Sequence, residues 1–508
     1  MVNSKIKTLD ELQQITTGLK SKGKKVVHCH GVFDLLHIGH IKHFEEARSL
    51  GDCLVVTITP DEYVNKGPNR PAFTTELRLE ALAALEAVDF VSTNKWPIAV
   101  ETIKIIQPDI YCKGPDYKDH KDDVTGKIDD EEQAVESVGG KICYTKDITF
   151  SSSSLLNKYG DVYSETQKSF IEKMLDGQNI DQIKNSIDNF KNLKVLVIGE
   201  TIIDQYVFCE ALGKSGKEPV LVLRDLGMDQ YVGGAAAIAR HLSDFCGTVS
   251  LLSMLGEKRE YGDFVLESLP ENIKPYLIYK EGSPTITKKR YVDYISKSKS
   301  LGVYSLDDGQ MNGKNQEKLN TYLAELIPKH DLVIVSDYGH GFLSRETAIQ
   351  ISKHSIFTSL NAQINAANIG YHTMNNYRNI DCAIINETEL RHELRDRESG
   401  VEILMKELAN TLQVQHLVVT QGNGGATLYD TESKHYHHCP AFAAKVVDKI
   451  GAGDAMLALL SCALKSGFNP NLALFLGSLA AAQSVETIGN SISVNKIQLI
   501  KAFSHAVK

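Results

Sequence analysis

Two short runs of the 508-residue chain place phosphate-binding residue types beside glycine. His37-Ile38-Gly39-His40 lies where a β-rich run passes into a helical pattern, and Gly451-Ala452-Gly453-Asp454 precedes an apolar segment of helical spacing. Imidazoles and first-turn amides can bind phosphate oxygens, and glycine lets the backbone approach them closely. Asp454 can also take the proton of a substrate hydroxyl. The first run suits nucleotidyl transfer, and the second suits a small-molecule kinase.

Each run also has a plainer interpretation, which the residues alone leave open. The histidine run could be a chance tetrapeptide in a turn, and the glycine run a turn closed by an aspartate N-cap. Asp34 is a turn or capping carboxylate as readily as a site residue. His28 and His30 alternate on one face of a strand, and we expect them in the core or at its rim.

A third cluster of chemically capable residues does not predict a metal site. Its spacing does not fit a closed zinc site, and no second Cys or His pair lies nearby. We expect a strand with exposed histidines here and no resident metal. The cluster comprises His435, His437, His438 and Cys439.

The elements around both runs predict parallel sheets. Residues 24–59 contain a strand, an amphipathic helix with Ile41, Phe44 and Ala47 on one face, and a second strand. Such a βαβ unit implies a parallel sheet, and the alternation continues to about residue 160. A second α/β series begins after Lys194 and continues to the end of the chain.

Between the two series, residues 161–193 are polar and helical in period. We therefore predict an α/β domain at 1–160, a helical linker at 161–193 and a second α/β domain at 194–508. Cleavage near Gly177 should then leave two independently folded fragments.

Composition excludes several classes of protein. Hydrophobic residues make up 42% of the chain and charged residues 23%, as in ordinary globular proteins. A net charge of −9 disfavours nucleic-acid binding and anionic membranes, and no apolar run approaches the length of a membrane span. Nine scattered cysteines without a Cys-x-x-Cys pair suggest reduced thiols, so we expect a cytoplasmic protein without membrane or nucleic-acid partners.

Residues 20–160 resemble the cytidylyltransferase-like nucleotidyltransferases, which have a Rossmann-like fold. The resemblance extends from Gly31-Val-Phe-Asp-Leu-Leu-His-Ile-Gly-His40 through Lys66-Gly-Pro-Asn-Arg-Pro71 and Arg78 to Lys113-Gly-Pro-Asp-Tyr-Lys118 and Thr149-Phe-Ser-Ser-Ser-Ser154. The residues of the second and third segments are most similar to those of the ADP-heptose synthases. The last segment is usually of the Gly-x-Ser-Thr-Thr type in that family, whereas serines alone stand here.

The resemblance implies roles for individual residues. His37 and His40 would contact the phosphates of CTP or ATP, and Lys66 and Arg78 would hold the triphosphate or the incoming sugar phosphate. The remaining nucleotide-binding positions that it implies are Gly31, Phe33, Gly39, Lys113, Ser152 and Ser153.

Residues 194–500 resemble the ribokinase-like carbohydrate kinases, most closely the heptose-phosphate kinases. The segments that match include Val197-Ile-Gly-Glu200, Pro284-Thr-Ile-Thr-Lys-Lys-Arg290, Ser336-Asp-Tyr-Gly-His-Gly341 and Thr420-Gln-Gly-Asn-Gly-Gly425. The resemblance implies that Asp454 is the catalytic base. The nucleotide would meet Gly422, Gly425, Gly451, Ala452 and Gly453, and the substrate would meet Asp204, Gly233, Gly234, Asn386 and Glu389. Mg²⁺ would accompany the ATP.

Three positions depart from the kinase pattern. Ala237 stands where the family has Asn, Lys449-Ile450 replaces the usual Thr-x before the anion hole, and Ser359-Leu-Asn-Ala-Gln-Ile364 replaces an Asp-Pro-Lys segment. In the bifunctional ADP-heptose enzymes the kinase domain precedes the nucleotidyltransferase, whereas here it follows.

Two functions remain possible at this point. In the first, a bifunctional enzyme of nucleotide-sugar synthesis phosphorylates a sugar or sugar phosphate with ATP and joins a sugar phosphate to CTP or ATP, releasing pyrophosphate. In the second, only the N-terminal domain is catalytic, and the kinase-like domain binds a ligand or mediates oligomerisation. We expect a homo-oligomer in both.

Overall fold

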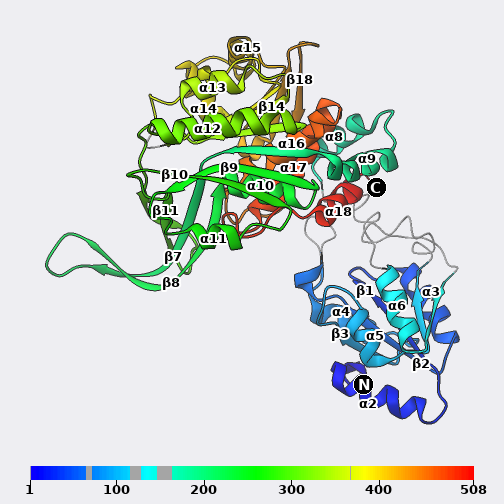
Figure 1. The fold of residues 1–508 in the computed structure, drawn as a ribbon. Helices are drawn as coiled ribbons and strands as arrows, with labels where there is room; N and C mark the ends of the chain where they lie inside the picture. Colours follow the sequence, from blue (N-terminus) through cyan, green and yellow to red (C-terminus); the bar gives the residue numbers. More distant parts are fainter. Residues whose placement is uncertain (1, 65–70, 115–127, 146–162, 366–367, 508) are drawn as a thin grey trace. The chain divides into compact units, whose positions relative to one another are not determined.

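Buried strands alternate with amphipathic helices along both halves of the chain in a computed structural model (Figure 1). It describes residues 2–64, 71–114, 128–145, 163–365 and 368–507. Met1–Ser164 with Ile500–Lys508 form one compact unit, and Glu165–Leu499 form the other. Both are α/β units, as the sequence predicts, and each is described by itself below.

The smaller unit is built on a five-stranded parallel sheet with the order β3-β2-β1-β4-β5. All six residues of β2 are buried, which is typical of a parallel strand covered by helices on both faces. The strands are β1 Val26–Gly31, β2 Cys53–Ile58, β3 Phe90–Thr93, β4 Ile110–Lys113 and β5 Lys141–Tyr144. The helices are α1 Val2–Lys5, α2 Leu9–Lys20, α3 Ile38–Ser49, α4 Thr75–Ala83, α5 Val100–Ile106 and α6 Ile128–Ser137, with a 3₁₀ turn η1 at Asp61–Tyr63.

The strand order of this sheet reverses between β1 and β4. Open α/β sheets bind ligands outside the carboxyl ends of the strands at such a switch point. The loop after β1 carries His37, and β4 ends at Lys113. Two segments that are far apart in sequence are therefore brought to one edge of the sheet.

The larger unit has a nine-stranded sheet in the order β10-β9-β6-β13-β14-β15-β16-β17-β18. The strands are parallel up to β16, and the last two are antiparallel. Their bounds are β6 Lys194–Gly199, β9 Thr248–Gly256, β10 Ile273–Lys280, β13 Leu332–Asp337, β14 Phe357–Ala362, β15 Cys382–Asn386, β16 His416–Thr420, β17 Ala426–Asp430 and β18 His435–Cys439.

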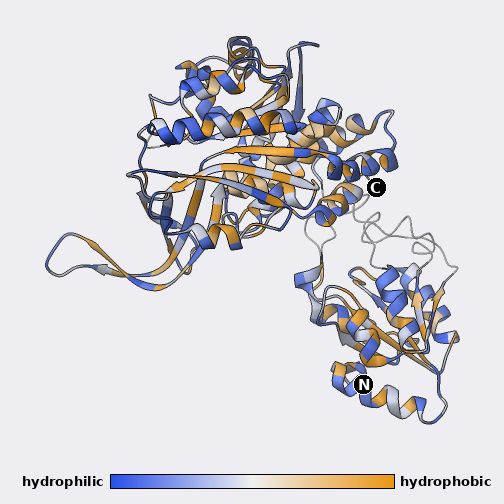
Figure 2. Ribbon diagram, viewed as in Figure 1, coloured by the Kyte–Doolittle hydropathy of each residue, from blue (hydrophilic) through white to orange (hydrophobic). Residues whose placement is uncertain are grey.

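Helices cover both faces of this sheet. Helices α12, α13, α14 and α15 pack on one face, and α10, α16 and α17 form a second layer in which α16 contacts both neighbours. Figure 2 shows apolar residues concentrated along the strands, whereas helices such as α12 are polar on the outside. The bounds are α10 Ala235–Ser243, α11 Gly262–Glu267, α12 Gly313–Leu326, α13 Arg345–Ile351, α14 Glu387–Leu394, α15 Val401–Leu412, α16 Ala452–Lys465 and α17 Pro470–Val485. The last helix, α18 (Lys496–Ala506), begins in this unit, and its residues from Ile500 onward are grouped with the smaller unit. No helix in the described ranges combines the length and apolarity that spanning a membrane requires.

A second sheet of four strands, in the order β12-β11-β7-β8, belongs to the same unit. β7 (Thr201–Lys214) and β8 (Leu221–Gly234) form a long antiparallel hairpin whose tip extends as an arm in Figure 1. β11 (Thr287–Asp293) pairs in parallel with β7, and β12 (Lys299–Ser305) pairs with β11. We call this the lid sheet, because residues of β7 and β11 line the cleft described below.

The predicted linker segment is helical, but its helices belong to the larger unit. α8 (Glu165–Leu175) buries Phe170 against Phe442 and Phe475, with ring centroids 6.2 and 6.0 Å apart. α9 (Ile180–Asp188) follows and buries Ile183 and Ile187. The larger unit therefore begins about 30 residues before the strand at which the sequence places its start.

Candidate functional sites

The histidine run lies at the N-terminus of α3, as its sequence predicts. His37 is the extended N-cap residue, and Gly39 and His40 stand in the first turn. The rings of His37 and His40 are stacked, with centroids 3.9 Å apart and planes inclined by 26°. Both residues are partly exposed. The two imidazoles therefore stand beside the first-turn amides of α3, which can bind an anion, while both ring nitrogens of His37 and Nδ1 of His40 are buried.

Phe33 packs against the His37–His40 pair. Its backbone is left-handed (φ +46°), and its ring packs edge-on against His40, with centroids 5.5 Å apart. A Cβ at Gly31 would lie only 2.9 Å from the Phe33 ring, so glycine is required for the ring to fold back over the strand end. Both residues were predicted to bind nucleotide. The structure gives them packing roles directly behind the histidines.

Lys113 and the strand histidines form a buried polar layer next to this site. Lys113 pairs with Glu131 at 2.7 Å, and both side chains are less than a tenth exposed. His28 and His30 each contact the Thr57 hydroxyl, at 2.8 and 2.9 Å, so they are core histidines, as expected. Burial, reinforced by the Lys113 charge, lowers the pKa of His30 to about 3. His30 is therefore neutral at physiological pH and serves as a hydrogen-bonding residue.

The surroundings of Arg78 differ from the phosphate-binding site in which the sequence predicts it. Its guanidinium is 1% exposed, and each of its five N–H donors has a protein acceptor: the carbonyls of Val32, Thr59 and Phe73, the Thr75 hydroxyl and the Asp61 carboxylate. In this arrangement no donor is left for a phosphate. We correct its role from phosphate binding to fixing the loop after β1 against α4.

Asp34 has the structural role that was one of its two interpretations. Its carboxylate oxygens accept the backbone N–H groups of Ala72 and Phe73 at 2.9 and 3.0 Å. The aspartate thus holds the segment that leads into α4. Lys66, Ser152 and Ser153, also predicted for this site, lie outside the described residues.

The second predicted site is a cleft of about 990 Å³ in the larger unit. It brings together ten of the eleven described residues that were predicted for the kinase site, and the eleventh, Gly233, is adjacent in sequence to one of them. Those in the lining are Asp204, Gly234, Asn386, Glu389, Gly422, Gly425, Gly451, Ala452, Gly453 and Asp454.

Asp454 stands in the first turn of α16, directly after the glycines. Gly451 is the N-cap residue with φ +91°, and a Cβ there would overlap the Asn490 side chain, so glycine alone fits. The amides of the first turn have no acceptor within the helix and are available to an anion. Burial raises the pKa of Asp454 to about 7, and the nearby Asp204 charge adds to this, while Tyr338 and Lys288 act in the opposite direction. A carboxyl group with this pKa can accept a proton near neutrality.

The lid sheet contributes charged residues to the cleft. Asp204 on β7 pairs with Arg290 on β11, and both are nearly buried. A Cβ at Gly233 would overlap the Asp204 carboxylate, and Gly234 has φ +61° and lies against Tyr338. The Gly-Gly pair therefore lets Asp204 lie close to the backbone of the neighbouring strand.

Asn386 and Glu389 form the capping box of α14. The Asn386 side chain accepts the Glu389 N–H at 2.8 Å, and the Glu389 carboxylate accepts the Asn386 N–H at 3.1 Å. Burial raises the pKa of Glu389 to about 7. The Asn-x-x-Glu pattern is thus accounted for in part by helix capping. Both residues nevertheless line the cleft.

The nucleotide loop predicted at Gly422 and Gly425 is a 3₁₀ turn, η7 (Gly422–Gly424), between β16 and β17. Gly425 has φ +89°, and a Cβ there would overlap the Cys439 carbonyl. Nearby, the Gln421 amide donates to Glu387 at 3.0 Å, and Arg391 also pairs with Glu387 at 2.7 Å. This side of the cleft therefore combines a glycine turn with a fixed cation.

The departures from the kinase pattern have separate locations. Ala237 is buried inside α10 and is absent from the cleft lining, whereas Lys449 is exposed and lines it. The carboxylate of the preceding residue, Asp448, accepts hydrogen bonds from the Tyr206 hydroxyl and the Lys299 ammonium group. It also accepts the backbone N–H groups of Ile450 and Gly489. Asp448 therefore ties the lid sheet to the loop before the anion hole.

The histidine cluster near the C-terminal strands forms β18, as expected. Its histidines have different partners: His437 contacts Asn471 at 3.1 Å, and His438 contacts Thr427 at 3.2 Å. Within the described ranges, no group of three or more His, Cys, Asp or Glu residues is arranged to hold a metal ion.

Three cleft residues were missed as site residues. Tyr338 donates to Asp454, and Lys288 and Arg290 project into the same cleft from β11. The i, i+2 spacing of Lys288 and Arg290 on a strand could have placed both on one face. Tyr338 lies in the segment Ser336–Gly341 that resembles the heptose-phosphate kinases, but its partner is 116 residues away, so no spacing along the chain indicated their contact.

Comparisons with known proteins agree with both units. The model of the pfkB family of carbohydrate kinases matches residues 192–497, and the cytidylyltransferase-like model matches residues 28–158. The Bifunctional protein HldE of Aliarcobacter butzleri is 43% identical over 141 residues, which are 27% of this chain and 29% of that protein. The Bifunctional protein HldE of Sulfurimonas denitrificans is 46% identical over 115 residues, 22% of this chain and 24% of that protein. The matches thus span less than a third of these relatives.

Solved structures resemble the larger unit in fold. The crystal structure of phosphofructokinase-2 from Escherichia coli in complex with potassium has a TM-score of 0.51 at 16% identity and covers 62% of this chain and 100% of that chain. The same enzyme in complex with substrates and products has a TM-score of 0.50 at 15% identity and the same coverage. The family match covers more than half of the chain and coincides with the cleft. The chain belongs to the pfkB family of carbohydrate kinases, and it carries a cytidylyltransferase-like domain ahead of the kinase domain.

Proposed function

We propose that this chain is a bifunctional enzyme of nucleotide-sugar biosynthesis. The N-terminal unit transfers a nucleotidyl group from CTP or ATP to a sugar phosphate and releases pyrophosphate. The C-terminal unit phosphorylates a sugar or a sugar phosphate with ATP. The observation that carries the proposal is Asp454, which stands in the first turn of α16 in the cleft that also contains the nucleotide loop.

In the proposed kinase step, the nucleotide and the sugar occupy opposite sides of the cleft. The first-turn amides of α16 hold the transferring phosphoryl group and offset its charge, and Asp454 takes the proton of the attacking hydroxyl. The nucleotide lies toward Gly422–Gly425, and the sugar lies toward Asp204 and the lid sheet. Asp454 in the first turn of α16, beside amides that can bind an anion, supports an active kinase over a module that only binds a ligand.

The nucleotidyl step relies on the paired imidazoles of His37 and His40. Attack of a sugar phosphate on the α-phosphorus of the nucleotide places additional negative charge on its oxygens, and the breaking bond releases pyrophosphate. Stacked rings at a helix N-terminus provide preorganised donors for that charge. Lys113, which pairs with Glu131, lies at the adjacent strand end.

Mg²⁺ is the cofactor proposed for both reactions. Carboxylate oxygens are the protein ligands that it prefers, and Glu387 and Glu389, which line the nucleotide side of the kinase cleft, would hold it there. The ion would neutralise charge on the phosphate chain of ATP. A raised Glu389 pKa also implies that cation binding there displaces a proton.

Two activity assays on the full chain test the proposal. The first measures ATP consumption with C6 and C7 sugars and their phosphates, and the second measures pyrophosphate release from CTP or ATP with sugar phosphates. Asp454→Asn should abolish only the first activity, and His40→Ala should reduce only the second. A wild type that consumes no ATP over the whole panel would reduce the C-terminal unit to a binding module.

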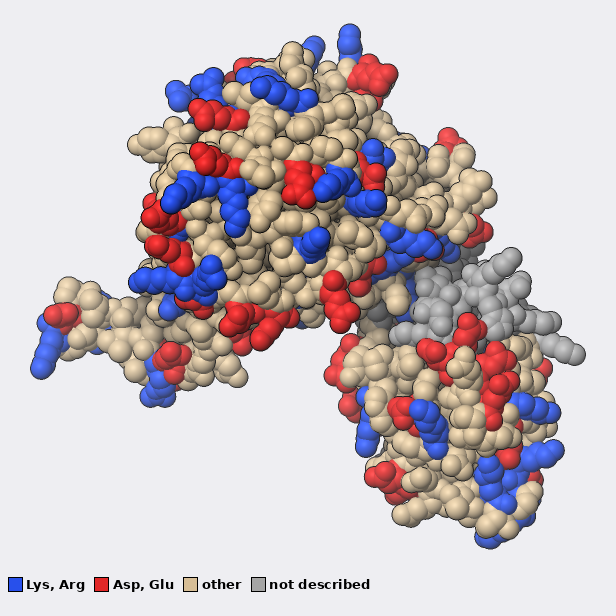
Figure 3. Space-filling model, in the orientation of Figure 1, with Lys and Arg blue, Asp and Glu red and all other residues tan. Residues whose placement is uncertain are grey.

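We also propose a cytoplasmic homo-oligomer. All nine cysteines lie in the described ranges and are free thiols, which suits a reducing compartment. Charges on the face in Figure 3 alternate in sign rather than forming a basic stripe, as expected for a protein that binds small molecules.

The lid sheet is the surface that we propose for pairing with a second copy. β8 and β12 are its edge strands, and the arm exposes apolar side chains that monomers usually bury. They are Leu212, Val220, Leu221, Val222, Leu226 and Met228. Leu221→Lys combined with Met228→Lys should lower the mass measured by light scattering to that of a monomer, and an unchanged mass would reject this surface.

A further inference from the structure

The proposed base of the kinase step has one neutral hydrogen-bond donor beside it, the Tyr338 hydroxyl. This group donates to Asp454 Oδ1 at 2.8 Å. Tyr338 is 4% exposed, so the hydroxyl has little access to water. A bond to one carboxylate oxygen fixes the rotamer of Asp454 and leaves Oδ2 for the hydroxyl of a substrate.

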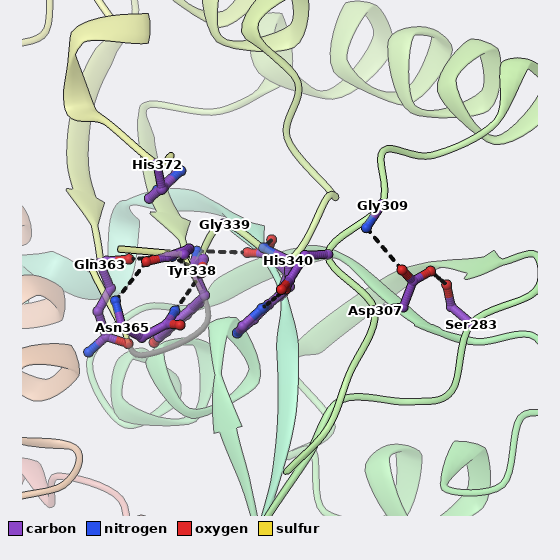
Figure 4. A network of polar contacts seen from close by, with 12 residues as sticks. Ser283, Asp307, Gly309, Tyr338, Gly339, His340, Gln363, Asn365 and His372 are labelled. Atoms are coloured by element: carbon purple, nitrogen blue, oxygen red, sulfur yellow. Dashed lines mark hydrogen bonds and ion pairs between the residues drawn. The ribbon is translucent and has the colours of Figure 1, made fainter. Parts of the chain in front are cut away.

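Tyr338 is itself held by an unusually complete set of backbone contacts (Figure 4). The two carboxylate oxygens of buried Glu200 accept the N–H groups of Tyr338 and His340, at 2.9 and 3.0 Å. The side-chain amides of Asn365 and Asn368 donate to the Tyr338 carbonyl, at 2.9 and 2.8 Å. The peptide groups on both sides of the tyrosine are therefore fixed.

The turn after Tyr338 is equally constrained. Gly339 has φ +68°, and its N–H donates to Asp337 at 3.0 Å. A Cβ at Gly339 would lie 2.6 Å from the Asn368 amide and 2.8 Å from the His372 ring, so only glycine lets these side chains close over the loop. The ring of His340 contacts Asp308 at 2.6 Å on the other side. Such a loop can hold the Tyr338 hydroxyl in one place.

The charged groups around Asp454 come from the lid sheet. Asp204 on β7 opposes its ionisation, and Lys288 on β11, which lies 5.6 Å from the centre of the Tyr338 ring, favours it. Both strands belong to a sheet that is separate from the one containing β13, the strand that ends just before the tyrosine. Tyr338 is therefore a contact of Asp454 whose backbone is held by Glu200, Asn365 and Asn368, none of which belongs to a lid-sheet strand.

From this geometry we infer that Tyr338 is the positioning residue of the kinase base: its hydroxyl selects the oxygen of Asp454 that faces the substrate and stabilises the ionised carboxylate. The inference rests on the proposed kinase function of this cleft. Tyr338 touches neither phosphate nor sugar in this role, and its effect passes entirely through Asp454.

The first test is the pH dependence of ATP consumption by Tyr338→Phe in the full chain. The variant lacks a hydrogen-bond donor to the ionised form of Asp454. The acid limb of its pH profile of kcat/KM should therefore lie about one pH unit higher than in the wild type. The variant should then be about tenfold slower than the wild type at pH 6 and nearly equal at pH 9. An acid limb at an unchanged pH would overturn the inference.

Tyr377→Phe is the matched control. Its hydroxyl is also buried and donates at 2.7 Å to Asp337, the residue before Tyr338, but has no contact with Asp454. It should lower the melting temperature and leave the acid limb in place. An equal shift in both variants would attribute the effect to loop packing and reject a specific role for Tyr338.

A second test needs no turnover. The difference in melting temperature between wild type and Tyr338→Phe should widen between pH 5 and pH 9, because the lost bond matters most to ionised Asp454. In an Asp454→Asn background this difference should no longer depend on pH. A constant difference in the wild-type background would overturn the inference, whereas the expected pattern in a chain that consumes no ATP would leave Tyr338 linked to Asp454 and reject only the kinase.

Discussion

At the scale of single residues, the proposed base Asp454 combines a place at the start of α16 with a pKa near neutrality. Its carboxyl group must be ionised to accept a proton, and burial raises its pKa from an ordinary value near 4 to about 7. We therefore expect kcat/KM of the kinase reaction to fall about tenfold per pH unit well below pH 7 and to level off above about pH 8. A pH profile at saturating Mg²⁺ measures this.

The same shift affects stability with a definite sign. The folded state keeps the Asp454 proton to a higher pH than the unfolded state does, so the free energy of unfolding declines as the pH rises from about 4 to about 7. Glu389 titrates in the same range and with the same sign. Asp454→Asn should flatten part of this decline, and a kinase profile flat from pH 5 to pH 9 would exclude Asp454 as the base.

His40 is the residue on which we expect the proposed nucleotidyl reaction to depend most directly. Replacing His40 with alanine removes one of two stacked imidazoles and a ring contact to Phe33. The rate of pyrophosphate release should fall by about a hundredfold or more, as for other preorganised donors. ATP consumption by the kinase unit is the internal control and should not change. An unaltered rate of pyrophosphate release would remove the histidine pair from the mechanism.

At the scale of elements, the anion site depends on how α16 begins. Gly451 needs a left-handed backbone and leaves no room for a methyl group, because Asn490 and Ser484 lie against it. Gly451→Ala should cost about 1–3 kcal/mol in strain and weaken ATP binding. Thermal denaturation and a nucleotide titration measure the two effects.

Gly453, two residues later, provides the matched control for that substitution. A Cβ there meets no atom within 4 Å. Gly453→Ala should therefore leave the melting temperature nearly unchanged. If both alanine variants melt alike, the helix start is not under the steric constraint that we describe.

At the scale of the whole molecule, the boundary between the units determines which fragments fold. Phe170 of α8 packs with Phe442 and Phe475 of the larger unit, and the Gln167 side chain donates to the Ala441 carbonyl at 2.7 Å. A fragment starting at Glu165 should therefore melt cooperatively, whereas one starting at Gln178 should be less stable by about 3–5 kcal/mol because a buried aromatic is lost. Equal melting temperatures would support the cut near Gly177 that the sequence suggests.

The sequence by itself determined the two α/β units and most of the kinase cleft. The periods of strands and helices are local properties of the sequence. Glycines next to an Asp or His also predict an anion site locally, because a helix N-terminus binds anions wherever it forms. For this reason the sequence alone predicts Gly451–Asp454, Gly422 and Asn386 as cleft residues. The same local patterns could not show that Asn386 and Glu389 cap a helix as well as line the cleft.

Only the tertiary structure decided the roles that depend on partners far away in sequence. From its sequence Arg78 is a candidate phosphate ligand, but in the fold it donates to the carbonyls of Val32 and Thr59. The polar helix α8 has the sequence of a linker, but in the fold its Phe170 packs against Phe475. Tyr338 acquires its importance from Asp454, 116 residues later. Hydrogen-bond saturation and burial are properties of the folded environment, and no spacing along the chain encodes them.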